Sequence, residues 1–169
     1  MAEGAIPPLE TWRCFGCSPG HDGGLRLTFT VPGPDRVRTE FVASEDHAGM
    51  GSILHGGIVA VVFDEVMMWC LLRYRRRFHV TVSMEQRLRR PVRVGIPLVA
   101  EAELDDDLEA DRVRLIARMW AAADPEATLA EGSGVFVPLP ERMLSLIPDD
   151  QRQEMEAILT GFASQDLTR

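Results

Sequence analysis

The feature that most constrains the fold is a long apolar stretch that runs from Leu54 to Leu72. It opens with a glycine pair, contains no proline, and its only charged side chains are the adjacent carboxylates Asp64 and Glu65. A helix that is apolar all round must be enclosed by the rest of the protein. Because an isolated ionised carboxylate is costly to bury, we expect one of these two residues to take part in chemistry.

Composition narrows the class of protein. The chain has 169 residues, which fits one domain with a substantial core, and its net charge of −8 disfavours general nucleic-acid binding. All 18 basic residues are arginine, and asparagine is absent as well as lysine. No signal peptide is visible, and the paired carboxylates interrupt the only run that approaches the roughly 18–20 apolar residues of a membrane span. Three cysteines do not make a disulfide framework. These features lead us to expect a cytoplasmic protein.

The remaining chain reads mostly as strands. Residues 25–31 alternate apolar and polar side chains, which is typical of a half-buried strand. A Pro-Gly-Pro-Asp turn separates them from a second strand over residues 37–42. The triplet 105–107, three aspartates, is predicted to be an acidic turn. Further strands are predicted over residues 80–90, 97–104, 113–122 and 127–137, and an amphipathic helix over residues 149–162.

This order of elements predicts an α+β fold in which one antiparallel sheet wraps around a single long central helix, with a second helix at the C-terminus. We expect residues 1–13 to be a loose tail, residues 14–140 to form the domain, and residues 141–169 to be a helical extension. The exposed sheet edges invite a partner subunit.

Three segments resemble a known family. His55-Gly56-Gly57, with Asp64 nine residues after the histidine, resembles the hotdog-fold acyl-CoA thioesterases of the phenylacetyl-CoA thioesterase-like branch. The segment 80–95, which ends in Arg-Pro-Val-Arg-Val-Gly, is similar to the strand and turn that follow in that family. Cys-Phe-Gly-Cys at 14–17 resembles the opening of one of its subgroups. The resemblance covers roughly residues 14–138 and implies the hotdog fold.

The resemblance also implies an oxyanion hole. The backbone N–H of Gly56 would bind the thioester carbonyl oxygen, with Gly57 at the helix start and His55 orienting the loop or polarising the carbonyl. Physical chemistry supports this role, since the first N–H groups of a helix lack internal partners and carry partial positive charge. The position at which some relatives carry a catalytic asparagine is Gly49 here, so no side-chain amide assists.

Asp64 matches the catalytic carboxylate of the family, as nucleophile or as general base on water. Thr81 matches a hydroxyl residue that holds the attacking water in related enzymes. Gly56 and Asp64 are eight residues apart, about 12 Å along a helix, whereas a carboxylate and an oxyanion donor must converge on one carbonyl group. We therefore predict a site shared between two subunits, in a homodimer or a dimer of dimers.

Other residues have less specific predictions. Glu65 lies about 100° around the helix from Asp64, and we expect it to face the dimer seam or pair with an arginine. Met68 is predicted to belong to the core and to line the acyl tunnel, while Arg89, Arg90 and Arg93 either bind coenzyme A phosphates or form a solvated face. Cys14 and Cys17 supply only half of a zinc site, so we predict a turn with buried thiols, and no metal or cofactor.

The sequence therefore predicts a thioester hydrolase that cleaves acyl-CoA. Two alternatives remain. One is a non-catalytic hotdog protein that binds acyl-CoA as a sensor or scaffold, and the other is a thioesterase for acyl groups bound to a carrier protein.

Overall fold

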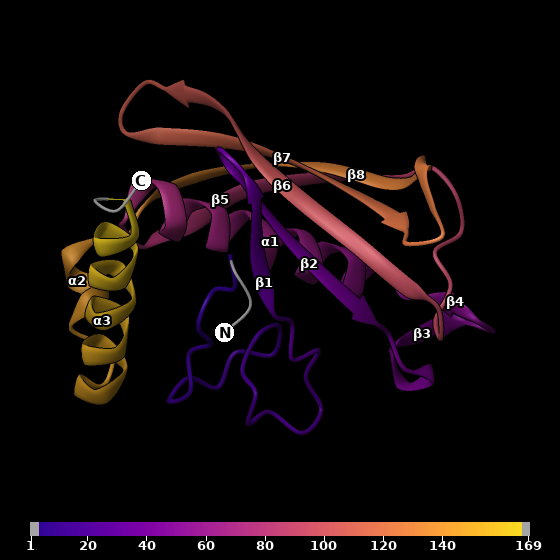
Figure 1. Ribbon diagram of the computed structural model, residues 1–169, viewed down its shortest axis with the longest axis horizontal. Helices are drawn as coiled ribbons and strands as arrows, with labels where there is room; N and C mark the ends of the chain where they lie inside the picture. Colours follow the sequence, from indigo (N-terminus) through magenta and orange to yellow (C-terminus); the bar gives the residue numbers. More distant parts are fainter. Residues whose placement is uncertain (1–3, 167–169) are drawn as a thin grey trace.

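The computed structural model describes residues 4–166 and consists of one sheet wrapped around a central helix (Figure 1). The helix is α1 (Gly56–Arg75), and a shorter α2 (Glu141–Leu144) and a second long helix, α3 (Asp149–Asp166), follow the last strand. The main strands are β1 (Phe29–Gly33), β2 (Arg36–Val42), β5 (His79–Leu88), β6 (Pro97–Leu108), β7 (Arg112–Ala121) and β8 (Asp124–Pro138).

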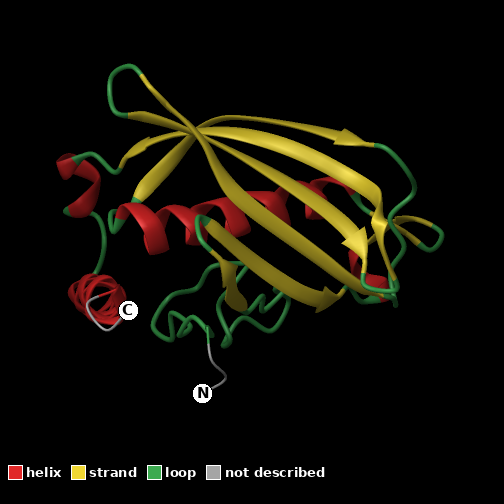
Figure 2. Cartoon of the chain, turned by 45° about the horizontal axis from the view of Figure 1, so that its top comes forward, coloured by secondary structure: helices red, strands yellow, loops and turns green. Residues whose placement is uncertain are grey.

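The six main strands are joined in the order β1-β2-β6-β7-β8-β5, and all neighbours are antiparallel. The strands β3 (Ala48–Met50) and β4 (Ile53–Leu54) form a separate small hairpin just before α1. Figure 2 shows α1 lying along one face of the curved sheet, with the N-terminal loops on the other side of the helix. The α+β architecture predicted from the order of elements is confirmed.

Alternation of side chains explains why the sheet closes on this helix. In β7, Val113, Leu115 and Met119 are buried, while the arginines between them are exposed. These residues and their equivalents on β6 and β8 meet the sides of α1 that carry Val62 and Phe63, both with no exposed surface. The helix is therefore enclosed on most of its surface, as its apolar sequence requires.

The acidic turn predicted at residues 105–107 is wrong. These aspartates continue β6, which extends to Leu108 and pairs with β7 through a register shift between Leu104 and Asp106. Arg114 of β7 forms ion pairs with Asp105 and Asp106. A bulge and cross-strand cations thus accommodate acidic side chains on the outer face of a strand.

The N-terminal segment is not the loose tail that was predicted. Of its described residues, Ile6 and Leu9 are buried, and the Ile6 N–H donates to the Phe29 carbonyl oxygen at 2.9 Å. The backbone N–H and hydroxyl of Thr11 donate to Glu154 of α3. Residues 4–13 therefore join β1 to α3 and form part of the domain.

Within residues 4–166, none of the helices has both the length and the continuous apolar character that crossing a bilayer requires.

The closeness of β8 to α1 can be tested with Gly132. A Cβ atom there would lie 2.8 Å from Phe63 Cδ2 and 3.0 Å from the Glu85 carbonyl oxygen. We expect Gly132→Ala to lower the free energy of unfolding by about 1–3 kcal/mol, because neither neighbour can withdraw freely. Gly161→Ala is the matched control, since nothing lies within 4 Å of that Cβ on α3, and it should stabilise by about 0.5–1 kcal/mol. Urea denaturation measures both, and equal effects of the two substitutions would contradict this packing.

Candidate active site

The start of α1 is organised by His55. This residue is the N-cap, with extended φ and ψ angles of −60° and 132°, and its Nδ1 accepts a hydrogen bond from the Gly57 N–H at 2.9 Å. The Ile58 N–H donates to the His55 carbonyl oxygen, also at 2.9 Å. The His55 ring therefore caps the helix and so fixes the conformation of the glycine pair.

The N–H of Gly56 has no hydrogen-bond acceptor in this cap. Within the described residues it donates to no acceptor, whereas the N–H groups of the next three residues all do. The Gly56 carbonyl oxygen is also held, because Gln86 Nε2 of β5 donates to it at 3.0 Å. The predicted oxyanion donor is thus a free amide at the positive end of a long helix. Gly57 is placed beside it, but its own N–H is engaged.

Gln86 was not singled out in the sequence. It lies within a strand of alternating residues, and nothing in that pattern distinguishes it from its neighbours. Its amide ties the first turn of α1 to the C-terminal half of β5, where Leu88 also approaches, with Cδ1 3.4 Å from a Cβ built on Gly56.

Asp64 lies about two turns further along α1. It contacts β5 near the strand's N-terminal end, whereas Gly56 contacts β5 near its C-terminal end. The Thr81 hydroxyl of β5 donates to Asp64 Oδ1 at 2.6 Å, so the structure brings these two predicted residues together. The Asp64 side chain is half-buried and Thr81 is exposed. The carboxylate is therefore oriented by the hydroxyl and lies at an edge of the sheet.

Glu65 was predicted to face the dimer seam or to pair with an arginine. It turns to the N-terminal loop, where the Cys14 thiol donates to its Oε1 at 2.7 Å, and the dimer seam stays a prediction. Burial and the adjacent Cys14 raise the pKa of Glu65 to about 8. The two neighbouring carboxylates have separate surroundings because they point in different directions around the helix.

The predicted substrate-binding residues are less closely grouped. Met68 is half-buried against the core, and Arg89 forms an ion pair with Glu131 of β8. Arg93 Nη1 donates to the Ser52 hydroxyl at 3.1 Å, and the Arg93 backbone pairs with Ile53, three residues before Gly56. Arg90 is exposed. Of the three arginines, Arg93 is the one that the structure ties to the approach to α1.

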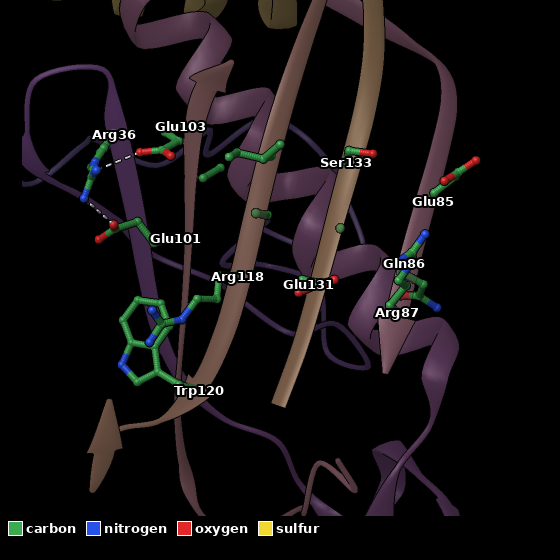
Figure 3. Close-up of a pocket in the computed structure, with 14 residues that line it drawn as sticks. Arg36, Glu85, Gln86, Arg87, Glu101, Glu103, Arg118, Trp120, Glu131 and Ser133 are labelled. Atoms are coloured by element: carbon green, nitrogen blue, oxygen red, sulfur yellow. Dashed lines mark hydrogen bonds and ion pairs between the residues drawn. The ribbon is translucent and has the colours of Figure 1, made fainter. Parts of the chain in front are cut away.

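A large hollow of about 550 Å³ lies elsewhere, on the face of the sheet turned away from α1 (Figure 3). Charged side chains line it, including Arg36, which is paired with Glu101 and Glu103. The Arg118 guanidinium lies over the Trp120 ring, with Cζ 4.6 Å from the ring centroid. Asp64 and Gly56 do not line this hollow, but Gln86, which holds the Gly56 carbonyl oxygen, does.

Comparison with known proteins supplies the context for this geometry. Residues 51–106 match the sequence profile of the thioesterase superfamily, a segment that contains His55, Gly56, Asp64 and Thr81. A search of curated proteins found no match.

Solved structures share the fold over most of the chain. A thioesterase superfamily protein aligns with 16% identity and a TM-score of 0.66, covering 79% of this chain and 67% of its own. Zebrafish thioesterase superfamily member 2 aligns with 22% identity and a TM-score of 0.61, covering 70% and 86%. A phenylacetic acid degradation-related protein from Ralstonia eutropha aligns with 14% identity and a TM-score of 0.59, covering 70% and 89%. The hotdog fold is confirmed, and the phenylacetyl-CoA branch stays a prediction.

The capping role of His55 predicts a specific pattern of stability. His55→Ala removes the acceptor for the Gly57 N–H and should lower the free energy of unfolding by about 0.5–2 kcal/mol. His55→Asn keeps a side-chain acceptor suited to an N-cap and should retain most of that stability. Chemical denaturation compares the two variants, and an equal loss in both would show that the ring does not act as the cap.

Proposed function

We propose, from the premise that this is a hotdog-fold protein whose residues 51–106 belong to the thioesterase superfamily, that the chain hydrolyses acyl-CoA thioesters to a free acid and coenzyme A. The proposal rests on the positions of Asp64 and Gly56, which contact opposite ends of the strand β5. The carboxylate of Asp64 is held near the start of β5 by Thr81. Gly56, whose N–H is free, is held near the end of β5 through its carbonyl oxygen, which accepts from Gln86.

One subunit cannot bring these two groups to the same carbonyl group. Eight helical residues separate them by about 12 Å, and the five residues from Thr81 to Gln86 span about 17 Å of strand. A tetrahedral intermediate needs the attacking oxygen and the oxyanion donor on either side of one carbon atom, within about 3 Å of each. The site must therefore combine groups from two copies of the chain.

The free edge of β5 provides a route to such a site. Among the described residues β5 pairs only with β8, and Thr81, Val82 and Ser83 are exposed. If two copies of β5 pair antiparallel about a two-fold axis near the middle of the strand, the Thr81 end of one meets the Gln86 end of the other. Asp64 of one protomer then faces the Gly56 N–H of its partner, and two equivalent sites result.

The chemistry follows from the hydrogen bonds of the two groups. The Thr81 hydroxyl occupies Asp64 Oδ1, which leaves Oδ2 to take a proton from water or to attack the thioester carbon directly. The carbonyl oxygen gains negative charge and is stabilised by the Gly56 N–H, a contribution of about 3–4 kcal/mol for one well-placed donor. The carbon–sulfur bond then breaks and coenzyme A leaves as the thiolate. On the water route the acid forms in this step, whereas direct attack leaves an anhydride of Asp64 that a water molecule must hydrolyse to release the acid and restore the carboxylate.

Arg93 and Arg90 are the residues that we propose for the phosphates of coenzyme A. Arg93 is joined through Ser52 and Ile53 to the loop that leads into Gly56, so a phosphate bound there stays close to the oxyanion donor. A guanidinium group suits phosphate because it donates in a bidentate geometry. Arg89 is already paired with Glu131, which makes it a weaker candidate.

Gly49 favours a second candidate function, in which the protein binds acyl-CoA without cleaving it. A Cβ on Gly49 would lie 3.2 Å from His55 Cα, so this position borders the candidate site but supplies no side-chain donor. If acyl-CoA binds to the wild type without release of free thiol, that function is supported. If the wild type turns over only a carrier-protein thioester, the protein is instead a thioesterase for carrier-bound acyl groups.

The carboxylate is tested by Asp64→Asn in a thiol-release assay with short, medium, aromatic and long acyl-CoAs. We expect kcat to fall by roughly 10²–10⁴-fold, since the amide cannot act as a base. Asp106→Asn, at an exposed position on β6, is the control and should keep the wild-type rate. Full activity of Asp64→Asn would remove the catalytic assignment.

The oxyanion donor is tested by Gly56→Pro. Gly56 is the first residue of α1 and follows an extended residue, a position where proline is tolerated, so this substitution removes the N–H with little change in the helix. We expect kcat to fall by roughly 10²–10³-fold. Gly56→Ala keeps the N–H, and its Cβ makes only ordinary contacts, so it should remain active. Similar rates for the proline and alanine variants would exclude this amide as the donor.

A further inference from the structure

A second cluster of reactive side chains lies on the other side of α1 from the sheet. Cys14 and Cys17 come from the N-terminal turn and Glu65 from the middle of the helix, and their sulfur and oxygen atoms all lie within 4.8 Å of one another. Figure 2 shows the N-terminal loops against this side of α1. The catalytic proposal makes no use of these three residues.

Backbone hydrogen bonds hold Cys14 in the turn. The Gly16 N–H donates to Cys14 Sγ at 3.3 Å, and the Ser18 N–H donates to the Cys14 carbonyl oxygen at 3.1 Å. Hydrogen bonds to the sulfur, of which the one from the Cys17 thiol is the strongest, lower the pKa of Cys14 to about 5. The three acidic groups thus share a small space, and the interaction with Cys14, together with burial, raises the pKa of Cys17, which is only 6% exposed.

Gly16 makes this close approach to the helix possible. A Cβ at Gly16 would lie 2.3 Å from Glu65 Cγ and 2.6 Å from Glu65 Oε1. The backbone of the turn therefore rests directly on the carboxylate, and this is why a glycine stands between the two cysteines. A lone Cys-x-x-Cys motif is weak evidence for metal binding, but here the fold adds a third ligand type from a distant part of the chain.

We propose that Cys14, Cys17 and Glu65 bind a Zn²⁺ ion, with a solvent molecule as the fourth ligand. Two thiolates and one carboxylate are ligands that zinc accepts, and Zn–S and Zn–O bonds of about 2.3 and 2.1 Å place tetrahedral donor atoms roughly 3.3–3.8 Å apart. The donor atoms of this cluster lie within 4.8 Å of one another, and Cys14 Sγ and Glu65 Oε1, which are 2.7 Å apart, would separate by about 1 Å to admit the ion. Cys14 is only partly buried, so the ion can enter without unfolding the turn.

The metal would neutralise the charge that accumulates when these groups ionise together, and would join the N-terminal turn to α1 one residue from Asp64. Its ligands are not used by the proposed catalytic groups, so the expected effect of the ion is on the stability of the turn. The inference does not depend on thioester hydrolysis, because it rests on contacts that Asp64 and Gly56 do not make.

Metal titration of the reduced, chelator-treated full-length protein tests the proposal. We expect the wild type to bind one Zn²⁺ per chain in competition with a chromophoric chelator, and to increase its Tm as zinc is added. Bound Co²⁺ should show the sulfur-to-metal charge-transfer bands and the intense visible bands of a tetrahedral site with thiolate ligands. A wild-type protein that remains folded and binds neither metal would overturn the proposal.

Variants locate the ion within the cluster. Cys14→Ser, Cys17→Ser and Glu65→Gln should each weaken Zn²⁺ binding by more than the roughly 10–100-fold lost when an outer-shell partner is removed. Cys70→Ser is the matched control, because that buried thiol faces the Asp35 carbonyl oxygen instead, and it should bind zinc like the wild type. Equal zinc affinity in the wild type and in a folded Cys14→Ser/Cys17→Ser double variant would contradict the assignment.

Discussion

The length of α1 determines how far apart the two proposed groups lie in one chain. A helix rises about 1.5 Å per residue, so the amide at its start and the carboxylate at its centre are held apart by a rigid spacer. The sheet packs against this spacer, and its side chains, among them Val62, Phe63 and Val66, have no exposed surface. Any reaction that uses both groups must therefore take them from different protomers.

The strand β5 is the element that connects this constraint to function. It touches both reactive groups of its own subunit, through Thr81 and through Gln86, and it leaves one edge without a neighbour among the described residues. An open edge of this kind normally requires protection from other chains. Here its pairing with a second copy would satisfy the exposed backbone and complete the proposed site by the same contact.

Much of the fold could be predicted because the signals are local. The apolar stretch and its glycine pair place α1 correctly, and alternation places β5, β7 and β8 within a few residues. The aspartates at 105–107 were misassigned because their composition is typical of turns, whereas cross-strand arginines decide the outcome in the folded sheet. The N-terminal segment was misassigned because its hydrogen bonds reach Phe29 of β1 and Glu154 of α3, the latter about 140 residues away in the sequence.

In the candidate site, too, local patterns could be predicted and contacts between distant residues could not. His55, Gly56, Asp64 and Thr81 could be proposed from spacing and resemblance, since they lie in one short motif and the strand that follows, and their roles stay predictions. The contacts of Gln86 with Gly56 and of Cys14 with Glu65 could not, because each joins residues that are distant in the sequence and belong to no common pattern.

Mixed oligomers test the shared site most directly. Asp64→Asn and Gly56→Pro chains, each inactive alone, would be denatured, mixed in equal amounts and refolded together. If each site takes Asp64 from one protomer and Gly56 from its partner, half of the dimers are mixed and each has one intact site, so the mixture should recover about a quarter of wild-type activity. Mixed dimers that form but remain as inactive as either parent would contradict the account, because both groups would then act within one chain.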